Sequence, residues 1–136
     1  SPRTDLAPAL EYLNHVVRRR SVAFLVSDFL APPCDRLLRV TARRHDLVSL
    51  VIGDKRELSL PAAGFVDFQD PETGRRVLLD TSHAPARRAL LAAQSARRTA
   101  LLRSLRAARS DAVELYAGEP YDRQLVRFFR TRERRR

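Results

Sequence analysis

Apolar positions along the chain follow two periods, one typical of amphipathic helices and one typical of buried strands. Residues 5–17 repeat apolar side chains at intervals of three and four, which predicts a helix with one buried face. Residues 21–29 instead hold five consecutive apolar side chains between charged neighbours, which predicts a strand buried on both faces. A second helix is expected over 35–44 and a second buried strand over 46–52. The expected inward positions of the two helices are Leu6, Ala9, Leu10, Leu13, Val16, Val17, Leu37, Leu38, Val40 and Thr41.

The period changes in the middle of the chain. Two short runs, 64–70 and 75–80, have the composition of strands. The segment Pro71-Glu72-Thr73-Gly74 between them is a turn signal, because Gly74 can adopt a positive φ. We therefore predict a β-hairpin at about 64–80, inserted into the surrounding α/β pattern.

The last third of the chain predicts a helix, a strand and a second helix. Thr81-Ser82 opens the longest helix, which is expected to run to about Arg109, and residues 112–116 form a third short strand. Pro120 starts the final helix, and the arginine-rich tail at 130–136 is expected to be solvated. The core positions expected in this helix are Tyr121, Leu125, Phe128 and Phe129. Strands that alternate with helices predict one α/β domain over residues 1–136, with a mainly parallel sheet.

Composition limits the classes of protein that the chain can belong to. One cysteine, Cys34, excludes an internal disulfide and favours a reducing, cytoplasmic location. The longest apolar run is too short to cross a bilayer, so we expect no membrane segment in this chain. Methionine is absent even at position 1, and we therefore expect the chain to be a piece of a longer polypeptide.

The net charge of +10 is unevenly distributed. Seven arginines and no carboxylate lie between Asp80 and Asp111, and six arginines lie within 127–136. Such clusters can bind phosphate-rich partners. GC-rich coding offers another explanation, because Lys55 is the only lysine beside 25 arginines. A nucleic-acid-binding module is therefore the alternative function, and its candidate contacts are Arg87, Arg88, Arg97 and Arg98.

Ser27, Asp28 and His45 carry the side chains of a hydrolase triad, but their positions argue against one. Ser27 ends the first strand, whereas His45 precedes the second. In parallel strands these positions lie at opposite edges of the sheet, roughly 20 Å apart at about 3.3 Å per residue. A general base must lie within hydrogen-bond reach of its nucleophile, so we do not expect an enzyme.

Ser27 and Asp28 follow the first strand at its carboxyl end, where open α/β sheets form their ligand sites. Thr4, in the loop before the first helix, is expected at the same edge. Hydroxyl and carboxylate oxygens suit Mg²⁺, although two such groups are too few for an octahedral site. The alternative interpretation is that Thr4 caps the helix and Asp28 is a solvated loop residue.

Several blocks of the chain together resemble a known family. They are Thr4-Asp5-Leu6, Leu25-Val26-Ser27-Asp28-Phe29, Arg44-His45-Asp46-Leu47-Val48, Asp70-Pro71-Glu72-Thr73-Gly74 and Leu125-Val126-Arg127-Phe128-Phe129. In this order they are similar to the C-terminal half of a von Willebrand factor A-like domain, in the fifty-eighth family among the bacterial domains of unknown function. The resemblance covers essentially the whole chain and depends on the set of blocks, since none is specific alone.

The resemblance implies a Rossmann-like sheet with helices on both faces and a metal-ion-dependent adhesion site at its carboxyl edge. Thr4 matches the threonine of that site and Asp28 its aspartate, with Ser27 beside it. The Asp-x-Ser-x-Ser loop of the site is absent, which implies an incomplete site with no cofactor here and Mg²⁺ only in the full-length domain. The strand at 21–27 would also lack its usual neighbour. We expect this exposed apolar edge to be covered by a homodimer or by another segment.

The family usually accompanies MoxR-type AAA+ ATPases, so the resemblance also implies a partner. We expect an adaptor that works with such an ATPase in the chaperone-like assembly or maturation of other proteins. Its protein contacts are expected at Asp28, Phe29 and Glu72. Under this interpretation we expect no nucleic-acid partner.

Overall fold

The computed structural model describes residues 5–30, 33–53, 65–69, 74–80 and 82–135, in which helices and strands alternate except at three consecutive strands in the middle of the chain. Their order is α1 (Ala7–Val16), β1 (Val22–Ser27), α2 (Asp35–Arg44), β2 (Asp46–Gly53), β3 (Phe65–Gln69), β4 (Arg76–Asp80), α3 (Ala84–Ala107), β5 (Asp111–Tyr116) and α4 (Asp122–Arg135). The predicted α/β organisation is confirmed, including the βαβ unit and the hairpin.

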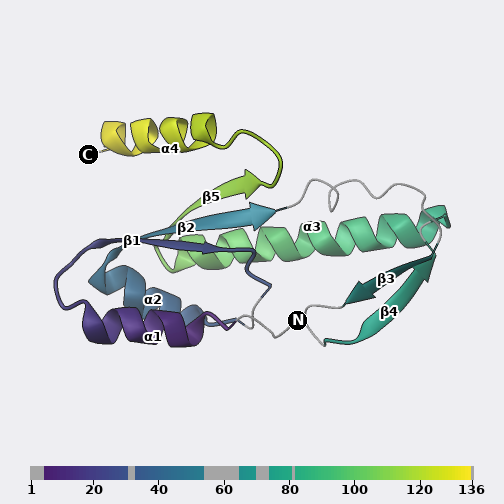
Figure 1. Ribbon diagram of the computed structural model, residues 1–136, viewed down its shortest axis with the longest axis horizontal. Helices are drawn as coiled ribbons and strands as arrows, with labels where there is room; N and C mark the ends of the chain where they lie inside the picture. Colours follow the sequence, from purple (N-terminus) through teal and green to yellow (C-terminus); the bar gives the residue numbers. More distant parts are fainter. Residues whose placement is uncertain (1–4, 31–32, 54–64, 70–73, 81, 136) are drawn as a thin grey trace.

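A three-stranded parallel sheet with the order β1-β2-β5 forms the centre of the fold. The register pairs Val22 with Asp46 and Ser27 with Val51, so the strands end together at one carboxyl edge. Helices α1, α2 and α3 lie on one face of the sheet, and α4 lies on the other (Figure 1). The sheet is therefore the middle of three layers.

The core lies between the sheet and the three helices on its first face. Leu10, Leu38 and Leu105 come from α1, α2 and α3, and they pack with Leu47 and Val51 of β2 in one buried cluster. Burial of these side chains is the main favourable term for the fold, at roughly 1.5–3 kcal/mol for each fully buried leucine or valine.

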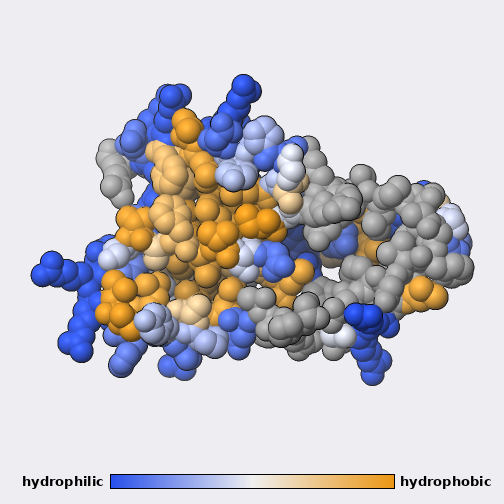
Figure 2. Space-filling model, in the orientation of Figure 1, coloured by the Kyte–Doolittle hydropathy of each residue, from blue (hydrophilic) through white to orange (hydrophobic). Residues whose placement is uncertain are grey.

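The second face of the sheet is only partly covered at β1. Val22, Phe24 and Val26 remain 52%, 49% and 59% exposed, so the prediction of a strand buried on both faces is wrong for β1. Helix α4 covers this face incompletely, which explains the difference. The Phe129 ring meets the Phe24 ring edge-on, with 6.0 Å between ring centroids, and Phe129 is itself 38% exposed. No described strand pairs with the outer side of β1. Figure 2 shows the hydrophobic surface to which these exposed side chains belong.

The buried faces of α1 and α2 differ from the predicted stripes. Val16 and Val40 are exposed, whereas Asn14 is buried. Asn14 Nδ2 donates a hydrogen bond to Thr41 Oγ1 at 2.9 Å, and this contact lies between the two helices. A pattern of apolar residues cannot predict a buried contact between polar side chains. The predicted buried face therefore included Val16 and left out Asn14.

The arginine-rich end of the chain is helical and is not simply a solvated tail. Helix α4 continues to Arg135, and only 15% of the Arg132 side chain is exposed. Its guanidinium forms ion pairs with Asp111, at 3.1 Å from Nε, and with Asp46. These carboxylates begin β5 and β2 and hold α4 against the amino edge of the sheet. Tyr121, by contrast, is exposed and does not join the predicted core stripe.

The position of helix α3 explains why the predicted apolar stripe is weak in the first half of the helix. The helix has 24 residues and is about 36 Å long. Only its second half, with Leu105 fully buried, covers the sheet, while its first half extends toward the β3–β4 hairpin (Figure 1). The hairpin is antiparallel, and Gly74 has the predicted positive φ of 73°.

Candidate functional site at the carboxyl edge of the sheet

The chain makes a tight turn directly after β1. Ser27 Oγ accepts a hydrogen bond from the Phe29 N–H at 3.0 Å, and Asp28 Oδ1 accepts one from the Leu30 N–H at 3.1 Å. Phe29 has a positive φ of 57°, a backbone conformation that is uncommon for a residue with a side chain. The turn fixes Asp28 in an exposed position, while the Phe29 side chain packs against the core.

His45 lies at the other end of the sheet from Ser27. Ser27 pairs with Val51 in the register, whereas His45 Nδ1 accepts a hydrogen bond from the Ser21 N–H at 3.2 Å. The ring of His45 is buried between the first residues of the two strands. The geometry therefore separates the two residues as the sequence predicted, and His45 is not within reach of Ser27 as a base.

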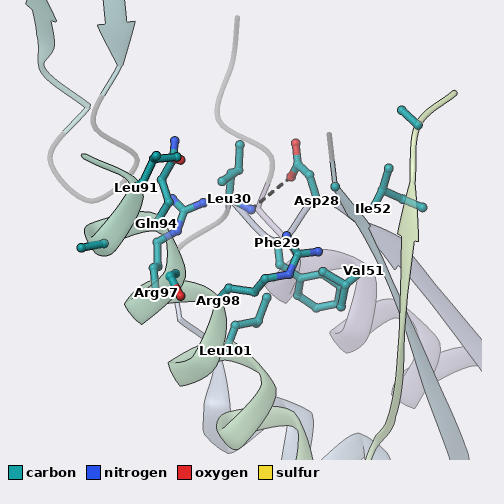
Figure 3. A pocket seen from close by; sticks show the side chains of 14 residues that line it. Asp28, Phe29, Leu30, Val51, Ile52, Leu91, Gln94, Arg97, Arg98 and Leu101 are labelled. Carbon is teal, nitrogen blue, oxygen red and sulfur yellow. Dashed lines mark hydrogen bonds between the residues drawn. The ribbon is translucent and has the colours of Figure 1, made fainter. Parts of the chain in front are cut away.

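A cavity of about 630 Å³ opens beside this turn, between the carboxyl ends of β1 and β2 and the middle of α3 (Figure 3). Its apolar lining includes Phe29, Leu30, Val51, Ile52, Leu91 and Leu101. Its polar side chains are Asp28, Ser95, Gln94, Arg97 and Arg98. An apolar cavity with a few polar groups is typical of sites that receive a ligand or a partner's side chain.

Arg98 is held at the inner side of this cavity by two residues of β5. Its Nε donates to Glu114 Oε2 at 2.6 Å, and its guanidinium carbon lies 4.9 Å from the centroid of the Tyr116 ring. Tyr116 donates its hydroxyl to the same Glu114 oxygen at 3.0 Å. Burial, followed by this hydrogen bond, raises the pKa of Tyr116 above its ordinary value. One guanidinium nitrogen, Nη2, is buried with no hydrogen-bond partner among the described residues.

Gly53 makes room for this cluster at the end of β2. A Cβ atom at this position would lie 2.9 Å from Arg98 Nη2 and 3.2 Å from Tyr116 Cε1. A larger residue would therefore displace the guanidinium from the cavity wall. The free Nη2 can donate a hydrogen bond to a carbonyl or carboxylate oxygen that enters the cavity.

The described residues do not by themselves fit a Mg²⁺ site. Ser27 Oγ and one oxygen of Asp28 already accept backbone N–H groups, and Mg²⁺ requires near-octahedral oxygen ligands. Within the described ranges, no three His, Cys, Asp or Glu side chains gather to hold a metal ion. Thr4 lies outside the described residues, as does Glu72, so their expected places at the site are not part of this geometry.

The four arginines proposed as nucleic-acid contacts lie along α3 in different environments. Arg88 is exposed, and Arg87 and Arg97 are half-buried. Arg98 points inward to Glu114 and leaves 20% of its side chain exposed. The pattern of arginines along the chain did not predict this inward position of Arg98. The signal was Glu114 itself, because a carboxylate inside a short apolar strand requires a cationic partner.

The fold and this cavity define an α/β domain whose candidate site lies at the carboxyl edge of a parallel sheet. The sequence matches the family described as "Protein of unknown function DUF58" over residues 1–100. This chain therefore belongs to the DUF58 family.

Two curated relatives are similar along nearly the whole chain. "Uncharacterized protein MAV169" of Mycobacterium avium is 34% identical over 135 residues, which span 97% of this chain and 78% of that protein. "Uncharacterized protein Rv1480" of Mycobacterium tuberculosis is 36% identical over 134 residues, which span 97% of this chain and 42% of that protein. No solved structure matches the chain significantly. None of the described helices is both long and apolar enough to span a membrane.

Proposed function

We propose that this chain is a non-enzymatic protein-interaction domain of the von Willebrand factor A-like class, and that it acts as an adaptor for a MoxR-type AAA+ ATPase in chaperone-like assembly or maturation. The observation that carries the proposal is the exposed carboxylate of Asp28, which the turn after β1 holds beside an apolar cavity. A carboxylate in a fixed position next to a hollow suits the recognition of a basic and apolar segment on another protein.

The arrangement of the sheet supports the assignment to this class. Parallel strands in the order β1-β2-β5, with helices on both faces, match what the later half of a Rossmann-like sheet would contain. Ligand sites of such sheets lie at their carboxyl edge, which is where Asp28 and the cavity lie. The separation of Ser27 from His45 supports a binding role over a hydrolytic one.

The partner is expected to make two kinds of contact. A lysine or arginine would pair with the Asp28 carboxylate, and an apolar side chain would enter the cavity between β2 and α3. A backbone carbonyl of the same segment could accept a hydrogen bond from Arg98 Nη2.

The test is capture of a MoxR-type ATPase from lysate of the source organism at physiological salt, after nuclease treatment, followed by binding of the purified ATPase. Asp28→Asn keeps an oxygen that can accept the Leu30 N–H but removes the charge, so the turn should survive. Glu11→Gln, which removes an exposed carboxylate on α1, is the matched control. We expect Asp28→Asn to weaken binding about tenfold, as for the loss of one charged contact, and Glu11→Gln to leave it unchanged.

Two results would count against the proposal. Equal binding by both variants would remove Asp28 from the interface. Failure of the purified ATPase to bind the unmodified chain would refute the adaptor role itself.

A nucleic-acid-binding module remains the second candidate, because one observation favours it. Four arginines of α4, at positions 123, 127, 130 and 134, are exposed and repeat at intervals of three or four residues, which places them along one side of the helix. A shallow groove of about 470 Å³ runs beside them. If phosphates bind there, affinity for a duplex should fall steeply as salt rises, and Arg127→Gln should reduce that slope by about one.

A further inference from the structure

The α3 wall of the cavity carries two arginines whose hydrogen-bonding capacity is not used up. Arg97 and Arg98 are consecutive residues of α3, and both side chains line the cavity (Figure 3). The buried Nη2 of Arg98 has no hydrogen-bond partner among the described residues. Arg97 is half-buried, and it forms no ion pair or hydrogen bond within the part of the chain that the structure describes. This wall therefore offers N–H donors and positive charge to a group that enters the cavity.

The neighbours of Arg98 hold its guanidinium in place before any ligand arrives. Glu114 and Tyr116 of β5 both contact it, and Gly53 at the end of β2 leaves the space that Nη2 occupies. The contacting groups thus come from β2 and β5, and β5 is the strand farthest from β1 in the sheet. Because the Arg98 side chain is already ordered, binding an oxygen atom here costs little conformational entropy.

A carboxylate is the group that best fits this wall. Guanidinium groups bind carboxylates through charge-assisted hydrogen bonds, which are about twice as strong as bonds to a neutral carbonyl. The charge of Arg98 is paired with Glu114, but Arg97 adds a second positive charge that no described carboxylate neutralises. The lining around the two arginines is apolar and includes Leu91 and Leu101. The ligand that fills this cavity therefore combines a carboxylate with an apolar group.

We infer that the cavity receives the C-terminal residue of the partner's segment, with its carboxylate on Arg97 and Arg98 and its apolar side chain between β2 and α3. The inference rests on the proposed function, because it specifies which part of the partner enters the site. A C-terminal residue carries a free carboxylate and an apolar side chain on the same Cα atom. An internal acidic residue uses its side chain for the carboxylate and leaves the apolar lining unfilled.

The charges around the cavity are complementary to those of such a chain end. The exposed Asp28 lies on the β1 side, the apolar lining lies between, and the arginines lie on α3. A segment with a basic residue shortly before an apolar C-terminal residue presents a cation, an apolar group and an anion. The basic residue pairs with Asp28, as in the proposed function. An anion that carries no cation is disfavoured, because Asp28 repels it.

Titration of the chain with short peptides, followed by nuclear magnetic resonance, tests the inference. The probe is acetyl-Lys-Ala-Leu with a free C-terminal carboxylate, and its match is the same peptide with a C-terminal carboxamide. The Nε–H signal of Arg98 reports binding at the cavity, and Arg98→Lys identifies this signal by removing it. We expect the carboxylate peptide to bind with a Kd of about 0.5 mM and the carboxamide peptide to bind about tenfold more weakly.

Two variants separate the contributions of the arginines. Arg97→Gln removes the unpaired charge, so it should weaken binding of the carboxylate peptide about tenfold and leave the carboxamide peptide unchanged. Gly53→Ala leaves every charge in place but introduces a Cβ atom 2.9 Å from Arg98 Nη2, so it should weaken the same peptide by displacing the guanidinium. Arg88→Gln removes an exposed arginine of the same helix and is the matched control, which should change neither affinity.

Several results would each overturn the inference. They are equal binding of the carboxylate and carboxamide peptides, an unchanged ratio of their affinities in Arg97→Gln, and no shift of the Arg98 signal up to about 10 mM peptide. Acetyl-Lys-Ala-Glu carboxamide that binds as tightly as the probe would replace the chain end with an acidic side chain. Free leucine that binds as tightly would replace it with a small molecule.

Failure of this inference is distinguishable from failure of the adaptor role. Asp28→Asn removes the contact with the lysine of both peptides, so it should weaken both equally, whereas Arg97→Gln changes the ratio of their affinities. If the purified ATPase binds through Asp28 and the peptides bind equally, only the further inference fails. If the carboxylate peptide binds more tightly and the ATPase does not bind, the adaptor role fails and the preference of the cavity for a chain end stands.

Discussion

The buried hydrogen bond between α1 and α2 offers a sharp test of the packing on the first face of the sheet. Asn14 Nδ2 donates to Thr41 Oγ1 at 2.9 Å, and the Thr41 hydroxyl donates in turn to the Leu37 carbonyl at 2.8 Å. Thr41 is fully buried and Asn14 nearly so. Thr41→Val keeps the shape of the side chain but removes the acceptor that satisfies Asn14.

The expected loss in the free energy of unfolding follows from the polar atoms of Asn14 that are left without hydrogen-bond partners. Among the described residues Asn14 Oδ1 has no hydrogen-bond partner, so Thr41→Val would leave the whole buried amide unsatisfied, at a cost of about 2 kcal/mol. Loss of the bond to Leu37 adds little, because a helical carbonyl retains its backbone partner. In an Asn14→Leu background the amide is gone, and the same Thr41→Val change should cost less than about 0.5 kcal/mol.

Urea unfolding followed by far-ultraviolet circular dichroism measures this cycle. With a slope of about 1.3 kcal/mol/M, Thr41→Val should lower the midpoint by roughly 1.5 M in the original chain and by much less beside Asn14→Leu. Equal shifts in the two backgrounds would show that the cost arises from packing of the threonine methyl group and would refute the argument from the unpaired amide.

Three further predictions concern groups at the edges of the sheet. Arg132→Leu leaves two carboxylates without their shared cation, and it should lower the free energy of unfolding by about 1–2 kcal/mol because the groups are partly exposed. The exposed Arg134→Leu should change it little in the same urea assay, and similar losses would contradict the role of the ion pairs. Tyr116 has a raised pKa, so an absorbance titration should show one tyrosine that ionises above about pH 10 and that Tyr116→Phe removes. Because the folded chain holds this proton more tightly than the unfolded chain, stability should decline as the pH rises above about 10, and a single shared transition for all tyrosines would contradict this. Burial, and then the neighbouring carboxylates Asp35 and Asp5, raise the pKa of Cys34, so iodoacetamide should alkylate the native chain more slowly than the urea-unfolded chain at about pH 8, and equal rates would argue against this protection.

Much of the candidate site was predictable from the chain alone. Asp28 follows an unbroken apolar run, and such runs end at the carboxyl edge of a parallel sheet. The same reasoning correctly placed His45 at the opposite edge. These predictions depend only on strand direction and on the rise per residue, which are local properties of the backbone.

The partners of α3 were not predictable in this way. Arg98 lies in a stretch of arginines and was interpreted as a surface contact, but it turns inward to Glu114 and Tyr116. Arg132 was assigned to a solvated tail and instead joins Asp46 and Asp111. Both pairings connect segments that are distant in sequence, so periodicity within one segment cannot reveal them.

By itself, the sequence determined the order of helices and strands, the parallel βαβ unit and the hairpin turn at Gly74, because each depends on spacing or backbone preference within a short segment. Only the tertiary structure decided which faces are buried. Apolar runs show that a strand can be buried, but the number of layers packed against it decides whether it is. For β1 that number is one complete layer and one partial layer, so Val22, Phe24 and Val26 each stay about half exposed.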